Sequence, residues 1–319
     1  VWLARNGGGK NSVVWLARFG GRKTEIYCLY ARVRNFAPLR KVLMLSPKIG
    51  DAIPQDRGCY NSDMIEEQVS SALFGACKVQ RGQTILVGFS GGVDSLCLLQ
   101  ILAAQPVRVI AAYFDHGLRP ESAQESDQCR QTAMSLGCEF VSGQGDVKGA
   151  AAQHLSVEEA GRTLRYQFLF EAAERQHADA VAVAHHADDQ VETLLMHLMR
   201  GAGSAGLAGM RYRSADPRGI SPIPLIRPLL GNWRQEIRQY CSEKGLTPLE
   251  DQTNEELTYF RNRIRRQLIP ELESYNPQVK RHLWQTAAIL AEENDGLEAT
   301  AQEASSTIVM ARGEHWVRL

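Results

Sequence analysis

The sequence predicts an α/β fold: a doubly wound, mainly parallel sheet followed by a helical C-terminal part. Three short apolar runs, at 85–89, 107–114 and 180–184, have the length and the β-branched or small residues that are typical of buried strands. After each run, apolar residues recur at helical spacing. Because strands and helices alternate along the chain, we expect parallel strands with helices on both faces of the sheet.

Residues 1–61 are expected to form a basic and poorly defined N-terminal extension. The first sixty residues carry eleven Lys and Arg against three Asp and Glu, and VWLAR occurs at Val1–Arg5 and again at Val14–Arg18. Two interpretations are open: a transit peptide, which is poor in acids, or an upstream stretch wrongly joined to the gene. From residue 62 onward, apolar residues at helical spacing predict a helix that leads into the first strand.

The most informative stretch is SGGVDS, which lies between the first predicted strand and its helix. The adjacent glycines allow positive φ and a close backbone approach, and a helix N-terminus presents N–H groups to an anion. The serines add hydroxyl donors, whereas Asp94 suits a phosphate site only if Mg²⁺ bridges it to the phosphates. A tight turn capped by Ser or Asp is the alternative, and a Walker A loop is excluded because no Gly-Lys-Ser/Thr follows. We assign to this phosphate-binding loop Ser90, Gly91, Gly92, Val93, Asp94 and Ser95.

A pair of polar residues, Asp115 and His116, follows the second predicted strand. Ligands of open α/β sheets bind beyond the carboxyl ends of the strands, so we expect the base or ribose of a nucleotide beside this pair. The alternative is a turn residue and a surface histidine. Residues 121–137 then predict a helix and 138–141 a short strand, and the capping box at Ser156–Glu159 opens another helix.

The second dense motif, HHADDQVET, begins directly after the third predicted strand. Asp189 and Glu192 are three residues apart on the helix that follows, so their side chains share a face. At the carboxyl end of a strand, in the same crevice as the phosphate-binding loop, two carboxylates are well placed to hold a cationic substrate. The alternative is that acids in the first turn only cap the helix. No arrangement here matches a zinc signature.

The segments after this helix indicate less regular structure. The glycine- and alanine-rich stretch 201–209 predicts a mobile loop, and the prolines of 222–230 restrict that segment to an edge or a crossing position. Residues 232–244 predict a helix that Asn232 caps and Gly245 ends.

A turn at 251–254 leads to the arginine-rich start of another helix, Arg261–Arg266. Ile264 is expected to face inward, while four arginines and no acid within 257–270 favour contacts with the phosphates of ATP or RNA. Apolar spacing over 277–293 predicts a last helix.

Composition excludes several classes of protein. The 319 residues allow one large or two modest domains, and 36 Lys and Arg balance 36 Asp and Glu, so the net charge indicates no nucleic-acid partner. The local basic clusters favour a partner held by one face, such as a folded RNA, although solvated helix faces are the alternative. Seven cysteines without a C-x-x-C pair indicate reduced thiols in a cytoplasmic protein. No apolar run approaches the roughly 20 residues of a membrane span, so we expect no membrane partner.

Seven motifs occur in a characteristic order within residues 62–290: SGGVDS, DHGLRPES, EEAGRTLRY, HHADDQVETLLMHLMRGAG, IRPLL, DQTN and RNRIR. In this order the chain resembles the tRNA(Ile)-lysidine synthetases, which are N-type ATP pyrophosphatases of the PP-loop superfamily. The resemblance implies a Rossmann-like sheet of the adenine nucleotide alpha hydrolase type. It also implies that 62–222 form the ATP-binding catalytic domain and that 223–319 form a helical, arginine-rich segment that completes the site and leads to a truncated C-terminal region.

The activity that this resemblance implies is the ligation of free L-lysine to a transfer RNA. ATP with Mg²⁺ adenylates the C2 carbonyl oxygen of the wobble cytidine in a tRNA(Ile) with a CAU anticodon, and pyrophosphate leaves. The side-chain amine of lysine then attacks C2 and expels AMP, which produces lysidine. The tRNA and L-lysine are the implied partners, and a homodimer is left open.

The resemblance also implies roles for particular residues. The SGGVDS loop binds the ATP phosphates, with Asp94 near Mg²⁺, and the acid pair holds lysine and deprotonates its amine. One functional arginine is Arg162 or Arg165, and another is Arg261 or Arg263. The catalytic set is thus Asp94, Asp189, Glu192, Arg165 and Arg261, with Asp115 and His116 beside the nucleotide.

Two departures from the family pattern concern tRNA selection rather than catalysis. Residues 1–60 have no place in that pattern, and only a short segment follows RNRIR, so the tRNA-binding C-terminal domain is expected to be cut down or missing. Two other functions compete. A tRNA 2-thiolation enzyme usually needs paired cysteines, and a non-catalytic nucleotide-binding module would have no use for the acid pair and its arginines.

Overall fold

The computed structural model describes residues 2–6, 13–17, 27–31, 62–117, 122–151, 157–249, 260–308, 311–312 and 317–318. The chain divides into two compact units, Val1–Gly58 and Cys59–Leu319. In the first unit the two copies of the VWLAR repeat contribute to neighbouring antiparallel strands, with Leu3 opposite Leu16. The strands of this sheet, in the order β1-β2-β3, are β1 (Trp2–Asn6), β2 (Val13–Ala17) and β3 (Tyr27–Ala31).

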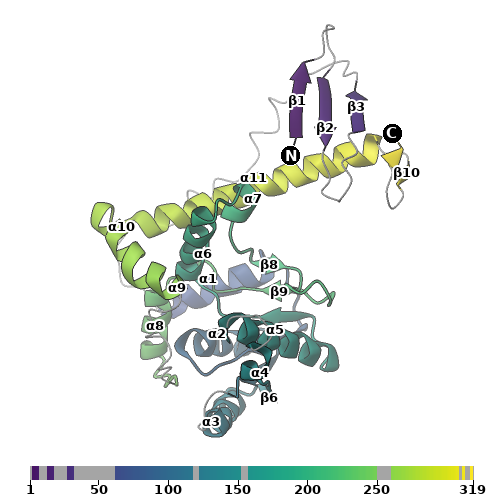
Figure 1. Ribbon diagram of the computed structural model, residues 1–319. Coiled ribbons are helices and arrows are strands. Elements are labelled where there is room, and N and C mark those ends of the chain that lie inside the picture. The colour runs from purple at the N-terminus through teal and green to yellow at the C-terminus, as the bar shows by residue number, and fades with distance from the viewer. Residues whose placement is uncertain are drawn as a thin grey trace. The chain divides into compact units, whose positions relative to one another are not determined.

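The second unit is built on a six-stranded sheet with the order β6-β5-β4-β7-β9-β8 (Figure 1). Neighbouring strands are parallel except β8, which joins β9 antiparallel at the edge. The predicted fold class is therefore confirmed. The strands are β4 (Thr84–Gly88), β5 (Arg108–Asp115), β6 (Glu139–Gln144), β7 (Ala180–Ala182), β8 (Arg213–Ser214) and β9 (Leu225–Ile226).

Strand order reverses between β4 and β7, and this reversal determines where a ligand can bind. From β4 the chain moves outward through β5 to β6, and it then returns to β7 on the other side of β4. In open α/β sheets the loops after the strands diverge at such a switch point and leave a crevice. Here the loops after β4 and β7, which carry SGGVDS and HHADDQVET, border that crevice because Val87 pairs with Ala182.

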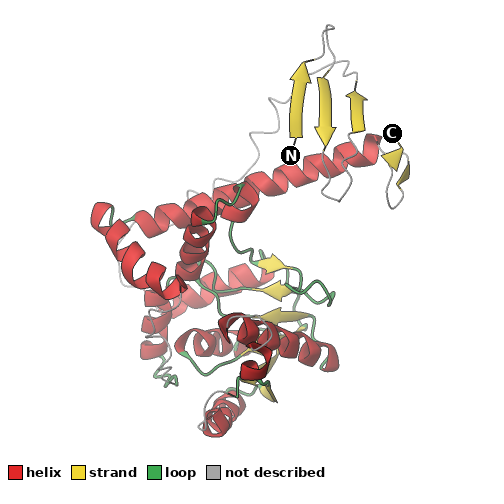
Figure 2. Ribbon diagram, viewed as in Figure 1, coloured by secondary structure: helices red, strands yellow, loops and turns green. Residues whose placement is uncertain are grey.

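Helices cover both faces of this sheet (Figure 2). Successive strand residues point to opposite faces, so Ile85 packs in one core with Leu98 of α2 and Ile237 of α8, and Leu86 packs in the other with Phe170 of α5. The helices are α1 (Ser62–Phe74), α2 (Val93–Ala103), α3 (Ser122–Ser135), α4 (Val147–Ala151), α5 (Val157–Arg175), α6 (Ala187–Met199), α7 (Ser204–Leu207), α8 (Arg234–Glu243), α9 (Phe260–Arg263), the π-helix η4 (Ile264–Leu268), α10 (Ile269–Tyr275) and α11 (Val279–Ile308).

Two predictions for the segment after α6 are wrong. Residues 201–209 contain the short helix α7, because the small residues allow a tight turn that buries Ala208. The proline-rich segment 222–230 contributes β9, an inner strand between β7 and β8. Its prolines flank Leu225–Ile226 and leave the N–H groups of both residues intact, so they do not confine the strand to an edge.

Two predicted helices also differ in their details. Asn232 does not cap α8: the Glu236 carboxylate accepts the backbone N–H of Trp233 at 2.9 Å, and Asn232 instead donates to Gln68 at 2.6 Å. The predicted end at Gly245 is confirmed by its φ of +64°. The last helix runs to Ile308 rather than 293, and the added residues include the good helix formers Ala, Glu, Gln and Leu.

Several expectations fall on residues that the structure does not describe. Ser156 of the capping box, the turn at 251–254 and residues 118–121 of the DHGLRPES motif all lie outside the described ranges. The expected boundary between the domains 62–222 and 223–319 falls within this sheet, because β8 precedes it and β9 follows it. The division of the chain at that position remains a prediction of the sequence. No helix within the described ranges is both long enough and apolar enough to cross a membrane.

Candidate active site

The SGGVDS loop connects β4 to α2 and presents the start of that helix. Gly91 has φ +79°, and a Cβ atom there would lie 2.5 Å from Leu249 Cδ1, so this position requires glycine. The Ser95 hydroxyl accepts the Ser90 backbone N–H at 3.2 Å and donates to the Gly92 carbonyl at 3.0 Å, which closes the turn. Gly92 supplies no side-chain cap, so backbone N–H groups at the N-terminus of α2 remain free for an anion.

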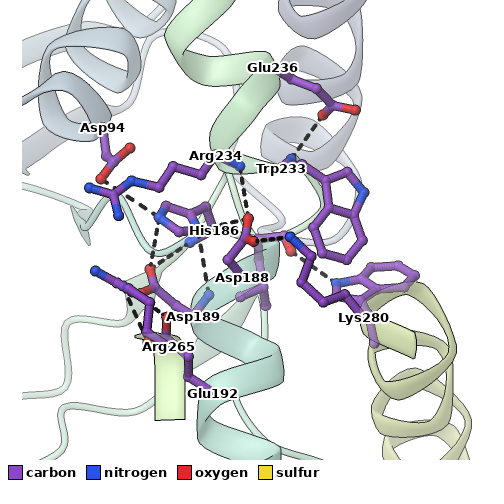
Figure 3. Close-up of polar contacts among 12 residues, drawn as sticks. Asp94, His186, Asp188, Asp189, Glu192, Trp233, Arg234, Glu236, Arg265 and Lys280 are labelled. Atoms are coloured by element: carbon purple, nitrogen blue, oxygen red, sulfur yellow. Dashed lines mark hydrogen bonds and ion pairs between the residues drawn. The ribbon is translucent and has the colours of Figure 1, made fainter. Parts of the chain in front are cut away.

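His186 joins this loop to the second motif. Its side chain is only 2% exposed, and its Nε2 lies 3.6 Å from Asp94 Oδ2 and 3.6 Å from Asp189 Oδ2 (Figure 3). Its Nδ1 lies 3.8 Å from Asp188 Oδ2. Although burial opposes the charge, the surrounding carboxylates raise the pKa of His186 above its ordinary value. Sequence reasoning assigned no role to this histidine, and its place directly after a strand was the available signal.

The acid pair is occupied by arginines from the helix that begins at Phe260. Glu192 is fully buried, and its carboxylate accepts from Arg261 Nε at 2.7 Å and from Arg265 Nη2 at 3.2 Å. Asp189 Oδ1 accepts from Arg261 Nη2 at 3.2 Å. Of the alternatives left open by the sequence, Arg261 reaches the acid pair and Arg263 is exposed. Arg265 contacts the same carboxylates, and sequence reasoning missed it.

A third carboxylate, Asp188, links the site to α8 and α11. Its oxygens accept from the Arg234 backbone N–H at 2.9 Å and from Lys280 Nζ at 3.0 Å (Figure 3). Although burial opposes the shift, these two donors hold the pKa of Asp188 below its usual range. Lys280 also lies over the Trp233 ring, 5.6 Å from its centre. The N-terminal ends of both helices are thus tied to the HHADD segment.

The remaining predicted residues lie at the same edge of the sheet or beside it. Asp115 is the last residue of β5, and its side chain accepts the backbone N–H of Gly117 at 2.8 Å, which makes a local turn. The His116 ring packs edge-on against Phe114 with their centres 5.0 Å apart. Arg165 lies on α5 with its Nε buried and without a hydrogen-bond partner, whereas Arg162 is exposed.

Among the described residues, six buried side-chain polar atoms lack a hydrogen-bond partner, and they form two groups. Native proteins rarely leave such atoms unpaired, so an unpaired group in a crevice indicates a ligand. Asp94 Oδ1 and Arg234 Nε form the first group, on the side of the SGGVDS loop. Burial opposes a lower pKa of Asp94, but His186 and then the Arg234 charge lower it. The second group comprises Arg165 Nε, Tyr166 OH, His185 Nδ1 and Arg227 Nε.

The loop side fits a magnesium ion that phosphates share. Asp94 Oδ1 is a buried carboxylate oxygen without a partner, and free N–H groups for phosphates lie beside it at the start of α2. No group of three His, Cys, Asp or Glu in the described part of the chain could enclose a metal by itself. Mg²⁺ commonly binds through one or two carboxylates together with substrate phosphates, which suits this donor set.

Comparison with known proteins identifies a family and relatives to which the chain is similar. Residues 64–272 match the family described as PP-loop domain. Curated relatives named tRNA(Ile)-lysidine synthase include those of Geobacter sulfurreducens, 39% identical over 72% of this chain, and Dehalococcoides mccartyi, 36% identical over 79%. The relative of Bacillus subtilis with that name is 35% identical over 75% of this chain. The chain covers 48%, 55% and 51% of these relatives, so it spans about half of their length.

A solved structure shares the fold at low sequence identity. The U34-tRNA thiolase NcsA from Methanococcus maripaludis is 17% identical, with a TM-score of 0.61 over 72% of this chain and 79% of that chain. At this identity the likeness shows the fold alone, and the chemistry has to be argued from the residues of the site.

Proposed function

This chain belongs to the PP-loop family, and we propose that it ligates L-lysine to C2 of the wobble cytidine of a CAU-anticodon tRNA(Ile) with ATP as the second substrate. One observation carries this proposal: Asp94 of the phosphate-binding loop and Asp189 of the acid pair both lie 3.6 Å from His186 Nε2. A site for a triphosphate and a site for an amine thus border one crevice, as a ligation through an adenylated intermediate requires.

In the first step the cytidine O2 attacks the α-phosphorus of ATP, and the bond to the β-phosphate oxygen breaks. The free N–H groups of the loop would hold the departing pyrophosphate. Arg234 and Arg265, whose charges reach Asp94, would offset the negative charge that develops on the phosphates. Mg²⁺, when bound at Asp94, would neutralise part of that charge.

In the second step the side-chain amine of lysine attacks C2, the bond from C2 to the AMP oxygen breaks, and the amine loses a proton. We assign the contact with the amine to Asp189, which is 8% exposed. Glu192 is fully buried between two guanidinium groups, so we assign to it the positioning of Arg261 and Arg265. A lysine ammonium has to compete with these arginines for the Asp189 carboxylate.

The alternative of 2-thiolation is disfavoured by the cysteines of the described chain. The five described free cysteine side chains are all buried, and burial raises the pKa of the Cys77 thiol to about 12. A thiol of this kind is a poor nucleophile near neutral pH.

The test is to incubate the full chain with CAU-anticodon tRNA(Ile), ATP and labelled L-lysine, and then to analyse the nucleosides. We expect lysidine at position 34 together with AMP and pyrophosphate, and no incorporation into the same tRNA with uridine at that position. Conversion of ATP without lysine incorporation would contradict the proposal and favour another tRNA-modifying activity of this family. Two further proposals are a cytoplasmic location and a homodimer, and sedimentation of the purified chain checks the latter.

A further inference from the structure

The second group of unpartnered polar atoms belongs to a set of side chains that also includes Arg162. We call this set the unpaired arginine cluster: Arg162, Arg165 and Arg227 with Tyr166 and His185. Arg162 and Arg165 lie over the Tyr166 ring, with their guanidinium carbons 5.2 Å and 5.6 Å from its centre. Arg227 and His185 follow the neighbouring parallel strands β9 and β7, in which Ile226 pairs with Ala182. Parallel pairing therefore brings both residues to the carboxyl edge of the sheet, next to α5.

No carboxylate of a described residue forms an ion pair with an arginine of this cluster. Burial and the neighbouring Arg162 hold the pKa values of Arg165 and Arg227 below the usual arginine value. By contrast, the pKa of Arg261 is raised: burial opposes the shift, but Asp189 and Glu192 outweigh it. His185 adds no further positive charge, because burial and then Arg227 hold its pKa well below the ordinary value and keep it neutral.

Two cluster residues are too buried for this arrangement to be an ordinary solvated surface. Arg227 is 7% exposed, and its Nη1 donates to the Arg211 carbonyl at 2.8 Å, yet its Nε has no partner. Tyr166 is 2% exposed, and its hydroxyl lies close to the guanidinium groups of Arg165 and Arg227 but forms no well-aligned hydrogen bond. A buried, unpaired cation is costly, and an anion that enters the cluster would remove that cost.

Arg261 connects this cluster to the acid pair. It donates to Glu192 and Asp189, and its charge also acts on Arg165 and His185. His185 of the cluster also directly precedes His186, whose Nε2 lies 3.6 Å from Asp189 Oδ2. Carboxylates and unpaired guanidinium groups are thus neighbours on one side of the crevice. A free α-amino acid has the complementary pattern, since it carries ammonium and carboxylate groups on one small molecule.

We propose that the unpaired arginine cluster binds the α-carboxylate of the amino-acid substrate, with Arg165 and Arg227 as its counter-ions and the Tyr166 hydroxyl as a further donor. This inference rests on the proposed lysine ligation and names the group by which that substrate is recognised. A terminal carboxylate is slender enough to reach side chains as buried as Arg227 and Tyr166. The phosphodiester of a folded RNA is bulkier and is usually met by exposed arginines and lysines, so we take it as the competing occupant.

The first test is Tyr166→Phe, assayed with L-lysine and with cadaverine, which keeps both amines but lacks the carboxylate. A hydrogen bond to a charged group contributes roughly tenfold or more to binding, so we expect the KM for lysine to rise about tenfold. The KM for cadaverine should stay unchanged. Because the hydroxyl has no partner in the free protein, its loss should leave the melting temperature unchanged or raise it.

Tyr240→Phe is the matched control. Tyr240 is also fully buried, but its hydroxyl donates to Glu66 at 2.9 Å, away from the cluster. We expect this variant to melt at a lower temperature and to use lysine as the wild type does. Arg227→Lys is a second test that keeps the charge: it should reduce the preference for lysine over cadaverine because a point charge cannot replace the planar guanidinium.

The outcomes separate the alternatives. If Tyr166→Phe and Arg227→Lys change the KM values for lysine and cadaverine by the same factor, the cluster does not bind a carboxylate. A higher KM for tRNA with unchanged lysine selectivity would show that an RNA phosphate is the occupant and overturn the inference. A wild-type chain that makes lysidine but uses lysine and cadaverine equally well would overturn this inference alone. A chain that uses neither substrate would overturn the proposed function as well.

Discussion

Asp94 Oδ2 and His186 Nε2 lie 3.6 Å apart at the switch point of the sheet, although Asp94 is in the first turn of the helix after β4 and His186 follows β7. The same imidazole nitrogen lies 3.6 Å from Asp189. One buried imidazole thus lies beside the carboxylate assigned to ATP and the carboxylate assigned to lysine. His186 thus links the ATP part and the lysine part of the proposed site, although it takes no direct part in the reaction.

His186→Gln should therefore impair both substrates. Glutamine keeps a hydrogen-bond donor but cannot take the positive charge that the raised pKa of His186 favours, so we expect the KM values for ATP and for lysine to rise, each by about tenfold. Steady-state kinetics with each substrate varied in turn checks this expectation. A change confined to one substrate would show that His186 does not couple the two carboxylates.

Asp94→Asn should abolish ATP-dependent modification, with a loss of at least about a hundredfold, because a neutral amide cannot hold the cation that offsets the phosphate charge. Pyrophosphate release measures the effect. Asp179→Asn is the control, since Asp179 is an exposed carboxylate directly before β7 and accepts the Thr84 N–H at 2.8 Å, away from the site. Full activity of Asp94→Asn would remove the loop carboxylate from the site.

Glu192→Ala should weaken the use of lysine while adenylation persists. Loss of this carboxylate leaves Arg261 and Arg265 without their buried partner, so stability should also fall by about 3 kcal/mol. The lysine dependence of product formation and urea unfolding measure the two effects. An unchanged lysine requirement in a stably folded variant would show that the positioning of Arg261 and Arg265 by Glu192 does not affect the use of lysine.

Gly91→Ala should destabilise the loop, whereas Gly92→Ala should not. Gly91 has φ +79°, and its Cβ would lie 2.5 Å from Leu249, so we expect a loss of about 1–3 kcal/mol. At Gly92 φ is −67°, and the nearest heavy atom to an added Cβ is 3.6 Å away. Thermal unfolding of the two variants measures the difference. Equal melting temperatures would contradict the positive φ and the close contact of Gly91 in this loop.

Asp216 should contribute stability that depends on pH. Its buried carboxylate accepts from Arg218 Nη2 at 2.9 Å and from the Ser221 N–H at 3.0 Å, and these donors lower its pKa although burial opposes the shift. A lowered pKa in the folded state means that the stabilisation is present above the unfolded value of about 3.9 and is lost as the pH falls through the folded value.

Asp216→Asn should therefore cost about 2 kcal/mol at neutral pH and progressively less below pH 4 or so. Urea unfolding of the variant and the wild type over a pH series measures this difference. The same loss at every pH would show that the effect is one of packing rather than of charge.

Much of the fold could be predicted from local patterns. The apolar runs identified β4, β5 and β7, and the glycines of SGGVDS predicted the turn that the structure contains. The position of β9 could not be predicted, because prolines in its segment indicated an edge although they flank the two paired residues. Strand order depends on how distant segments pack, which the local pattern does not record.

The sequence by itself determined which residue types gather at the carboxyl edge of the sheet: the glycine loop, the acids after β7 and the arginines near Phe260. Only the tertiary structure decided the partners, since it placed His186 between Asp94 and Asp189 and paired Arg261 and Arg265 with Glu192. It gave Arg165 and Arg227 no acidic partner among the described residues. The physical reason is that a side chain's charge and shape are local properties, whereas its burial and its partner depend on segments brought together by folding.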